Sequence, residues 1–129
     1  CHLDAFMVEK GLGNLNLEEI DLLFIENVGN LICPNNYRLG EDVRLMIASM
    51  PEGDDKPYKY PGMFADSDVV LLNKTDLQPY LDFSEKSFRK VVTGLNPDVV
   101  IFPVSCTTGS GLTGWFTWLE DALRKKKKQ

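Results

Sequence analysis

Short apolar runs, each ending in a polar turn, are the feature of this sequence that most limits what it can fold into. The runs that we predict to be strands are Leu22 to Ile25, Val43 to Ser49, Val69 to Leu72 and Val99 to Val104. Uninterrupted apolar runs are typical of strands buried on both faces, as in parallel sheets covered by helices. Because helical patterns separate the later runs, the sequence predicts an α/β fold with a mostly parallel sheet.

Apolar residues at helical spacing predict three helices, over residues 2–10, from Ser84 to Leu95 and from Leu112 to Arg124. Ser84 is a preferred N-cap residue, and Asn96 with Pro97 is expected to end the second helix. The third helix is expected to turn its two Trp residues inward. Residues 51–61 are polar and rich in Pro, and we expect them to form a loop.

The length and composition indicate one globular domain, over residues 1–129. The chain is 43% apolar, yet none of its apolar runs approaches the ~20 residues that span a bilayer, so no membrane association is expected. The sequence begins with Cys rather than Met and has no basic stretch typical of a signal peptide. Three Cys residues, an odd number, do not make a disulfide framework and indicate a reducing compartment such as the cytoplasm.

The net charge of −5 conceals a strong asymmetry. Of the 14 basic residues, five lie in the tail from Arg124 to Lys128, which leaves 9 against 19 acidic residues in the body. An acidic body repels phosphate backbones, so nucleic-acid binding is disfavoured. We interpret the basic tail as a solvated helix end, with contact to a polyanion as the minor alternative.

Polar residues with specific chemistry follow the last two predicted strands. Asn73, Lys74 and Asp76 follow the strand that ends at Leu72, and Ser105, Cys106 and Thr107 follow the strand that ends at Val104. The carboxyl ends of neighbouring parallel strands open into one crevice, where ligands bind. We therefore expect these six residues to form one site.

An Asn-Lys-x-Asp turn beside a Ser-Cys-Thr turn can read guanine. The carboxylate of Asp76 can accept from the ring N1–H and from the 2-amino group, whereas adenine offers neither donor there and would leave the acid unpaired. Asn73 can tie the two turns together, and the stem of Lys74 can lie along the base and ribose. A backbone N–H near Cys106 can donate to the guanine carbonyl.

Glu26 and Gly29 suggest the phosphate half of the same site. In nucleotide hydrolases a strand beside the phosphate loop ends in an acid that orients a water or a ligand of Mg²⁺, and a following Gly brings its N–H to the γ-phosphate. In the stretch E-N-V-G, Glu26 and Gly29 fit these two roles. The alternative is a strand that simply ends at a polar residue.

Three glycines, Gly109, Gly111 and Gly114, also match the G-x-G-x-x-G dinucleotide fingerprint. That fingerprint requires another strand and an acidic residue about 20 positions further on. The chain continues instead into a Lys tail, so we interpret the glycines as shaping the turn around the base.

Several segments in order resemble the HypB family, the GTPases that incorporate nickel into hydrogenases. The resemblance is carried by CHLDA, DLLFIENVGNLICP, EGDDKPYKYPGMF, DVVLLNKTDL and NPDVVIFPVSCTTGSGL. It implies a three-layer P-loop NTPase-like fold of the SIMIBI type and a cytoplasmic homodimer that uses GTP and Mg²⁺. It also implies two kinds of partner, a hydrogenase large-subunit precursor and other nickel-delivery proteins. The urease-accessory GTPases are a related alternative, against which the Cys1-His2 pair argues.

One departure from the family is as important as the match. The phosphate-loop motif G-x-x-x-x-G-K-[ST] is absent from these residues, so the chain resembles a C-terminal portion of the family's GTP-binding domain. The resemblance implies that the family's first strand lies between the predicted strands 22–25 and 43–49. A chain without that strand is expected to have a slot in its sheet, and we expect these residues alone to show no GTP hydrolysis above background.

The resemblance also implies a metal site formed by Cys1, His2 and Cys33. Thiolate and imidazole are ligands that Zn²⁺ and Ni²⁺ take, and the family places this site at the subunit interface. Asp4 is a candidate to support the metal ligands. Two functions from different classes follow: a GTPase that drives nickel delivery, or a non-catalytic metal-binding, dimerising fragment.

Overall fold

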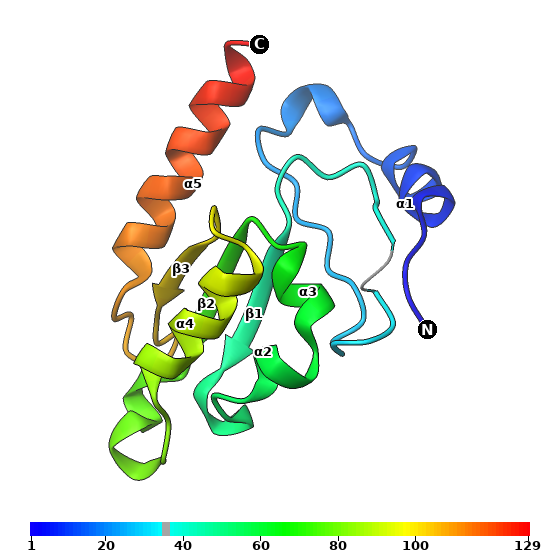
Figure 1. Cartoon of the computed structure of the whole chain (residues 1–129). Helices are drawn as coiled ribbons and strands as arrows, with labels where there is room; N and C mark the ends of the chain where they lie inside the picture. Colours follow the sequence, from blue (N-terminus) through cyan, green and yellow to red (C-terminus); the bar gives the residue numbers. More distant parts are fainter. Residues whose placement is uncertain (35–36) are drawn as a thin grey trace.

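The computed structural model describes residues 1–34 and 37–129 and contains a three-stranded parallel sheet (Figure 1). The strands are β1 (Leu45–Ser49), β2 (Val69–Asn73) and β3 (Val100–Pro103), in the order β1-β2-β3. The register aligns Met46 with Val70, and Val70 with Ile101. The last three predicted strands are thereby confirmed, with the apolar run of β2 buried at the centre.

Helices cover both faces of the sheet, as the α/β prediction requires. On one face, Val70 and Leu72 of β2 pack with Phe64 of α3 (Pro61–Ala65) and Phe88 of α4 (Glu85–Leu95). On the other face, Val69 and Leu71 pack with Trp115 of α5 (Leu112–Lys127). Alternate residues of a strand point to opposite faces, so one set of β2 side chains packs into each of the two cores.

Helix α4 begins and ends where its sequence predicts. The Ser84 hydroxyl accepts a hydrogen bond from the backbone N–H of Ser87 at 3.2 Å, and Asn96 follows the last helical residue. The Asn96 side chain also donates to the carbonyl of Ser67 at 2.8 Å, which fastens the end of α4 to the turn before β2.

The polar segment 51–61 contains short helices rather than only loop. They are the 3₁₀ helix η2 (Met50–Glu52) and α2 (Lys56–Lys59), and α3 begins at Pro61. Each begins with a Pro in its first turn, where the missing N–H costs nothing and the fixed φ favours helix. The prolines that predicted a loop thus start helical turns.

The basic tail forms the last turns of α5, which agrees with its interpretation as a helix end. Its side chains are exposed, but Lys126 pairs with Asp42 at 2.7 Å and Lys127 pairs with Asp21. The hydrogen bond from Lys127, together with its positive charge, lowers the pKa of Asp21 below the ordinary 3.8. The tail therefore contacts acidic residues that lie far away in the sequence.

The N-terminal segment begins with α1 (Ala5–Leu12), followed by the 3₁₀ helix η1 (Leu17–Glu19). The helix starts later than the predicted range 2–10, because Asp4 caps it: a carboxylate oxygen of Asp4 accepts from the N–H of Met7 at 2.8 Å. Gly13 follows the last helical residue and caps the helix, whereas Gly11 lies within it.

The predicted strand from Leu22 to Ile25 is wrong. These residues have no regular secondary structure, and Phe24 is 65% exposed. In Figure 1 the segment, in light blue, runs on the β1 side of the sheet. An apolar groove of about 1320 Å³ is lined by residues 22–25 and by Leu45 and Ile47 of β1.

A strand forms only when a neighbouring strand completes its hydrogen bonds, so an apolar pattern alone was insufficient at 22–25. Ile47, at the centre of β1, is 62% exposed. The groove agrees with the slot expected between the predicted strands 22–25 and 43–49.

Among the helices of the described residues, none is long and apolar enough to cross a membrane.

Candidate functional site

The turns after β2 and β3 are joined by backbone hydrogen bonds. The N–H of Val104 donates to the carbonyl of Leu72 at 2.9 Å, and the N–H of Thr75 donates to the carbonyl of Val104 at 3.2 Å. Between them, Lys74 has a left-handed backbone with φ 64°, which turns the chain sharply into the 3₁₀ helix η3 (Thr75–Tyr80). The two polar turns therefore lie together, as predicted from the sheet topology.

Ser105 fixes the carboxylate of Asp76. The Ser105 hydroxyl donates to a carboxylate oxygen of Asp76 at 2.7 Å and accepts from the N–H of Thr108 at 3.2 Å. Ser105 is only 1% exposed, whereas Asp76 is half-buried. Hydrogen bonds to a charged acceptor are roughly twice as strong as neutral ones. Asp76 is thus oriented by a buried donor and retains acceptor capacity toward solvent.

Asn73 ties the two turns together, as the sequence predicted. Its side-chain carbonyl accepts from the backbone N–H of Cys106 at 3.2 Å. This bond occupies the N–H of Cys106 itself, whereas the sequence predicted that a backbone N–H near Cys106 donates to the guanine carbonyl. The side chains of Lys74, Cys106 and Thr107 are exposed around this connection.

The glycine-rich stretch folds the second turn back on itself. The N–H of Ser105 donates to the carbonyl of Ser110 at 2.9 Å, and Gly109 donates to the carbonyl of Ser105 at 2.8 Å. Gly111 has φ +77°, and a Cβ there would collide with the carbonyl oxygen of Pro103. The glycines shape the turn beside the Asp76 carboxylate, in agreement with their interpretation from the sequence.

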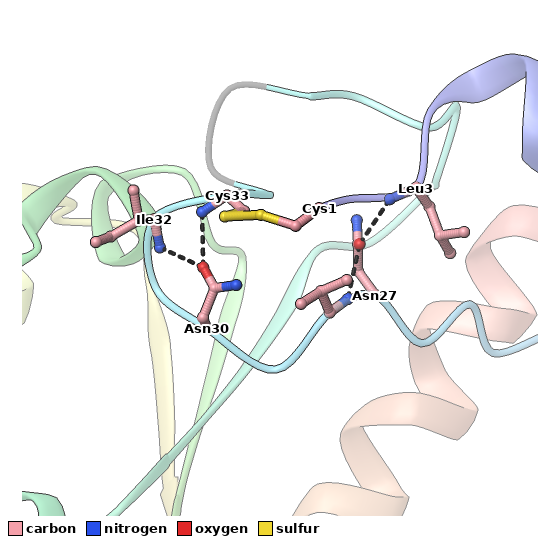
Figure 2. The surroundings of a disulfide bond; sticks show 7 residues. Cys1, Leu3, Asn27, Asn30, Ile32 and Cys33 are labelled. Atoms are coloured by element: carbon pink, nitrogen blue, oxygen red, sulfur yellow. Dashed lines mark hydrogen bonds between the residues drawn. A yellow bond between two sulfur atoms is a disulfide. The ribbon is translucent and has the colours of Figure 1, made fainter.

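Cys1 and Cys33 are brought together, in a form that the sequence did not predict. They are joined as a disulfide, with their Cα atoms 6.0 Å apart (Figure 2). The ring of His2 stacks on that of Tyr37, with centroids 3.6 Å apart. Asp4 caps α1, so its carboxylate has a structural role.

The donor set fits a soft metal ion only after reduction. A disulfide offers no thiolate, whereas two reduced thiols at this separation would supply two sulfur ligands. Within the described residues, no group of three or more His, Cys, Asp and Glu side chains has the arrangement of a metal site. The stacking of His2 on Tyr37 covers a face of the imidazole ring, whereas a metal ion would bind a ring nitrogen in the plane of the ring.

Within the described residues, no hydrogen bond joins Glu26 or Gly29 to the Asp76 group. Both are exposed, and both line the groove beside β1, whose lining does not include Asn73 or Asp76. The structure therefore places the two candidate phosphate-side residues at the open edge of the sheet.

Three residues that hold the Cys pair and its surroundings were not predicted from the sequence. Asn27 and Asn30 accept backbone hydrogen bonds near Cys1 and Cys33. Asn is a common turn residue for this reason, so the two Asn of E-N-V-G-N were an available signal. Arg44 donates to the carbonyls of Pro34 and Tyr37 at 3.1 and 2.7 Å. It lies in the run predicted as a strand, and no pattern in that run indicates this role.

Comparison with known proteins places this arrangement among nucleotide-binding domains. Hydrogenase maturation factor HypB of Azotobacter vinelandii is 49% identical over 99% of this chain, which covers 46% of that protein. The factor of the same name from Escherichia coli K12 is 46% identical over 93% of this chain, which covers 41% of it. The chain thus spans less than half the length of these curated relatives.

A solved structure, that of HypB from Helicobacter pylori in complex with nickel, matches with a TM-score of 0.92 and 37% identity. The match covers 98% of this chain and 60% of that one. The model of the CobW/HypB/UreG nucleotide-binding domain matches residues 1–103. Because that model covers most of the chain, including β1, β2 and the Asn-Lys-Thr-Asp turn, the chain belongs to the CobW/HypB/UreG nucleotide-binding domain family.

Proposed function

We propose that this chain is the guanine-reading and metal-holding portion of a protein that inserts nickel during [NiFe]-hydrogenase maturation with the use of GTP. Residues 1–129 are then one partial GTP-binding domain. The single observation that carries the proposal is the connection of the two turns by Ser105–Asp76 at 2.7 Å and Asn73–Cys106 at 3.2 Å.

The orientation of Asp76 supports the choice of guanine. Ser105 engages one carboxylate oxygen, and the group keeps acceptor sites for the N1–H and the 2-amino group of guanine. The stem of Lys74 lies along the base and ribose. Because Asn73 occupies the N–H of Cys106, the N–H of Thr107 is the neighbouring donor for the guanine carbonyl. Adenine would leave Asp76 without its two donors, and such a mismatch is costly in a polar site.

The E-N-V-G stretch supplies the candidates for the phosphate half of the site. In the proposed protein Glu26 orients the ligands of Mg²⁺ and Gly29 donates its N–H to the γ-phosphate. This chain has no phosphate-loop motif, so the lysine and hydroxyl that hold phosphates and Mg²⁺ would have to come from another segment.

The proximity of Cys1 and Cys33 supports a site for the nickel cargo, with Zn²⁺ as an alternative ion. In the reduced protein the two thiolates and the imidazole of His2 would hold the ion, and a homodimer would bring two such sets together. The proposed partners are a hydrogenase large-subunit precursor and other nickel-delivery proteins, in the cytoplasm and without nucleic acid or membrane. A role in urease assembly is the related alternative.

A non-catalytic, metal-binding and dimerising protein is the second candidate. The pairing of Cys1 with Cys33 favours it, because a metal site at this place needs no phosphate-loop motif to bind an ion and to join two subunits. Such a protein would recognise guanine only weakly.

The deciding experiment is to read the coding sequence upstream of Cys1 and to assay the protein that it encodes for GTP hydrolysis. We expect a phosphate-loop motif and turnover of GTP but not ATP, with Asp76→Asn reducing GTP turnover and Ser110→Ala leaving it unchanged. An upstream sequence without that motif, together with no turnover, would reject the GTPase in favour of the binding module.

A further inference from the structure

The Glu26–Gly29 turn and the Cys pair share one side-chain contact. The side-chain carbonyl of Asn27 accepts from the backbone N–H of Leu3 at 2.9 Å and from the N–H of Val28 at 2.7 Å. Figure 2 shows Asn27 between the N-terminal segment that carries Cys1 and the turn that leads to Cys33. One oxygen atom therefore connects two parts of the chain that lie 24 residues apart.

Cys33 is held by hydrogen bonds to Asn30, a residue of the same turn. The side-chain carbonyl of Asn30 accepts from the N–H groups of Ile32 and Cys33 at 2.9 and 2.7 Å. Asn30 therefore shapes the approach to Cys33 but does not reach the segment of Cys1. Among the described residues, the Cys1–Cys33 disulfide and the stacking of His2 on Tyr37 also join residues 1–3 to this region.

We propose that Asn27 is a positioning residue that couples the Glu26–Gly29 turn to the pairing of Cys1 with Cys33. Its oxygen bonds the N–H of Val28, which precedes Gly29, and the N–H of Leu3, two residues after Cys1. A change in the backbone at the turn therefore moves the acceptor that holds Cys1 near Cys33. The coupling rests on the proposed function for its biological use, because the turn is the candidate phosphate-side element and the two Cys are the candidate metal ligands.

The equilibrium constant for forming the Cys1–Cys33 disulfide shows how well Asn27 positions Cys1, and it can be measured without any metal. With oxidised glutathione, one Cys thiolate attacks the glutathione disulfide and releases one reduced glutathione, which leaves a mixed disulfide. The second thiolate then displaces the second glutathione and forms the Cys1–Cys33 bond. Two protein thiols are oxidised, one glutathione disulfide is reduced, and the two protons pass to the released glutathione. The equilibrium constant reports how closely the protein holds its two thiols.

The test compares Asn27→Ala with three other variants in glutathione buffers, with the protein's disulfide fraction read by mass spectrometry after acid quenching. Asn27→Asp keeps an acceptor oxygen, and Leu3→Pro removes the donor N–H from the opposite side. Asn14→Ala is the matched control, because Asn14 is an exposed Asn whose side-chain amide donates locally to the carbonyl of Lys10.

We expect Asn27→Ala to lower the equilibrium constant about 2- to 12-fold, the range for a single hydrogen bond. Leu3→Pro should give a similar loss, the double variant no larger loss, and Asn27→Asp a value within about twofold of the wild type. Nickel titration of the reduced protein, followed by thiolate-to-nickel charge-transfer absorption, should weaken in the same order.

Equal constants for Asn27→Ala and Asn14→Ala would overturn the proposal. If Asn27→Ala does not fold, Leu3→Pro decides in the same way. If the wild type binds no nickel, the proposed metal function is rejected. The role of Asn27 is still tested in that case, because the thiol–disulfide equilibrium is measured without metal.

Discussion

Replacing Ser105 with Ala tests the contact on which the proposed guanine site depends. The substitution removes the hydroxyl that donates to Asp76 at 2.7 Å and accepts from Thr108 at 3.2 Å. It changes little else, since Ser105 is 1% exposed and Ala occupies the same space without the oxygen.

The expected loss of stability follows from the partners. A hydrogen bond to a charged group contributes about 1.5–3 kcal/mol to the free energy of unfolding. Because Asp76 is half-buried, water can replace part of this contact, so we expect a loss of about 1.5–2 kcal/mol. For a chain of this size the loss corresponds to a decrease in Tm of roughly 6–8 °C.

Urea unfolding followed by the fluorescence of the buried Trp115 measures this loss. Ser110→Ala is the matched control, because Ser110 is exposed in the same turn and contributes only its backbone there. The control should change the free energy of unfolding by less than about 0.5 kcal/mol. If Ser105→Ala behaves like Ser110→Ala, the hydroxyl does not hold Asp76 and the argument for an oriented carboxylate fails.

Two further predictions concern contacts distant from the guanine turns. Arg44→Lys should lower the free energy of unfolding by about 1.5–3 kcal/mol, because the shorter ammonium cannot donate to Pro34 and Tyr37 while pairing with acidic neighbours. In the same unfolding assay, exposed Arg124→Lys should cost less than about 0.5 kcal/mol, and equal losses would contradict the role of Arg44. The pKa of Asp21, measured by NMR, should lie below 3.8 and return to it in Lys127→Ala. The stabilisation from this pair is present at neutral pH and is lost as the pH falls through the lowered pKa of Asp21. If the pKa of Asp21 is the same in Lys127→Ala as in the wild type, the pairing is contradicted.

The parts of the fold that were predictable depend on local patterns. The run of β2, the cap at Ser84 and the Asn-Lys-Thr-Asp turn each carry their signal within a few residues, and all three agree with the structure. The proximity of Asp76 to Ser105 was also predictable, because parallel strands bring their carboxyl ends to one edge of the sheet.

The parts that were not predictable depend on distant partners. Residues 22–25 have an apolar pattern that fits a strand, yet within the described part of the chain no strand pairs with them. The bond from Leu3 to Asn27 joins residues 24 positions apart, and the Cys1–Cys33 disulfide closes a separation of 32. Contacts of this kind are decided by the folded chain as a whole and leave no periodic signal.

The recognition of guanine by Asp76 is the central claim, and an NMR titration of the isotopically labelled protein tests it most directly. Titration with GDP should shift the amide signals of Asn73–Asp76 and Ser105–Thr107, whereas the same concentrations of ADP should leave them in place. In Asp76→Asn the response to GDP should fall and a response to xanthosine diphosphate should appear, because an amide can donate where the carboxylate only accepts. Equal shifts with GDP and ADP in the wild type, or an unchanged preference in Asp76→Asn, would contradict the assignment.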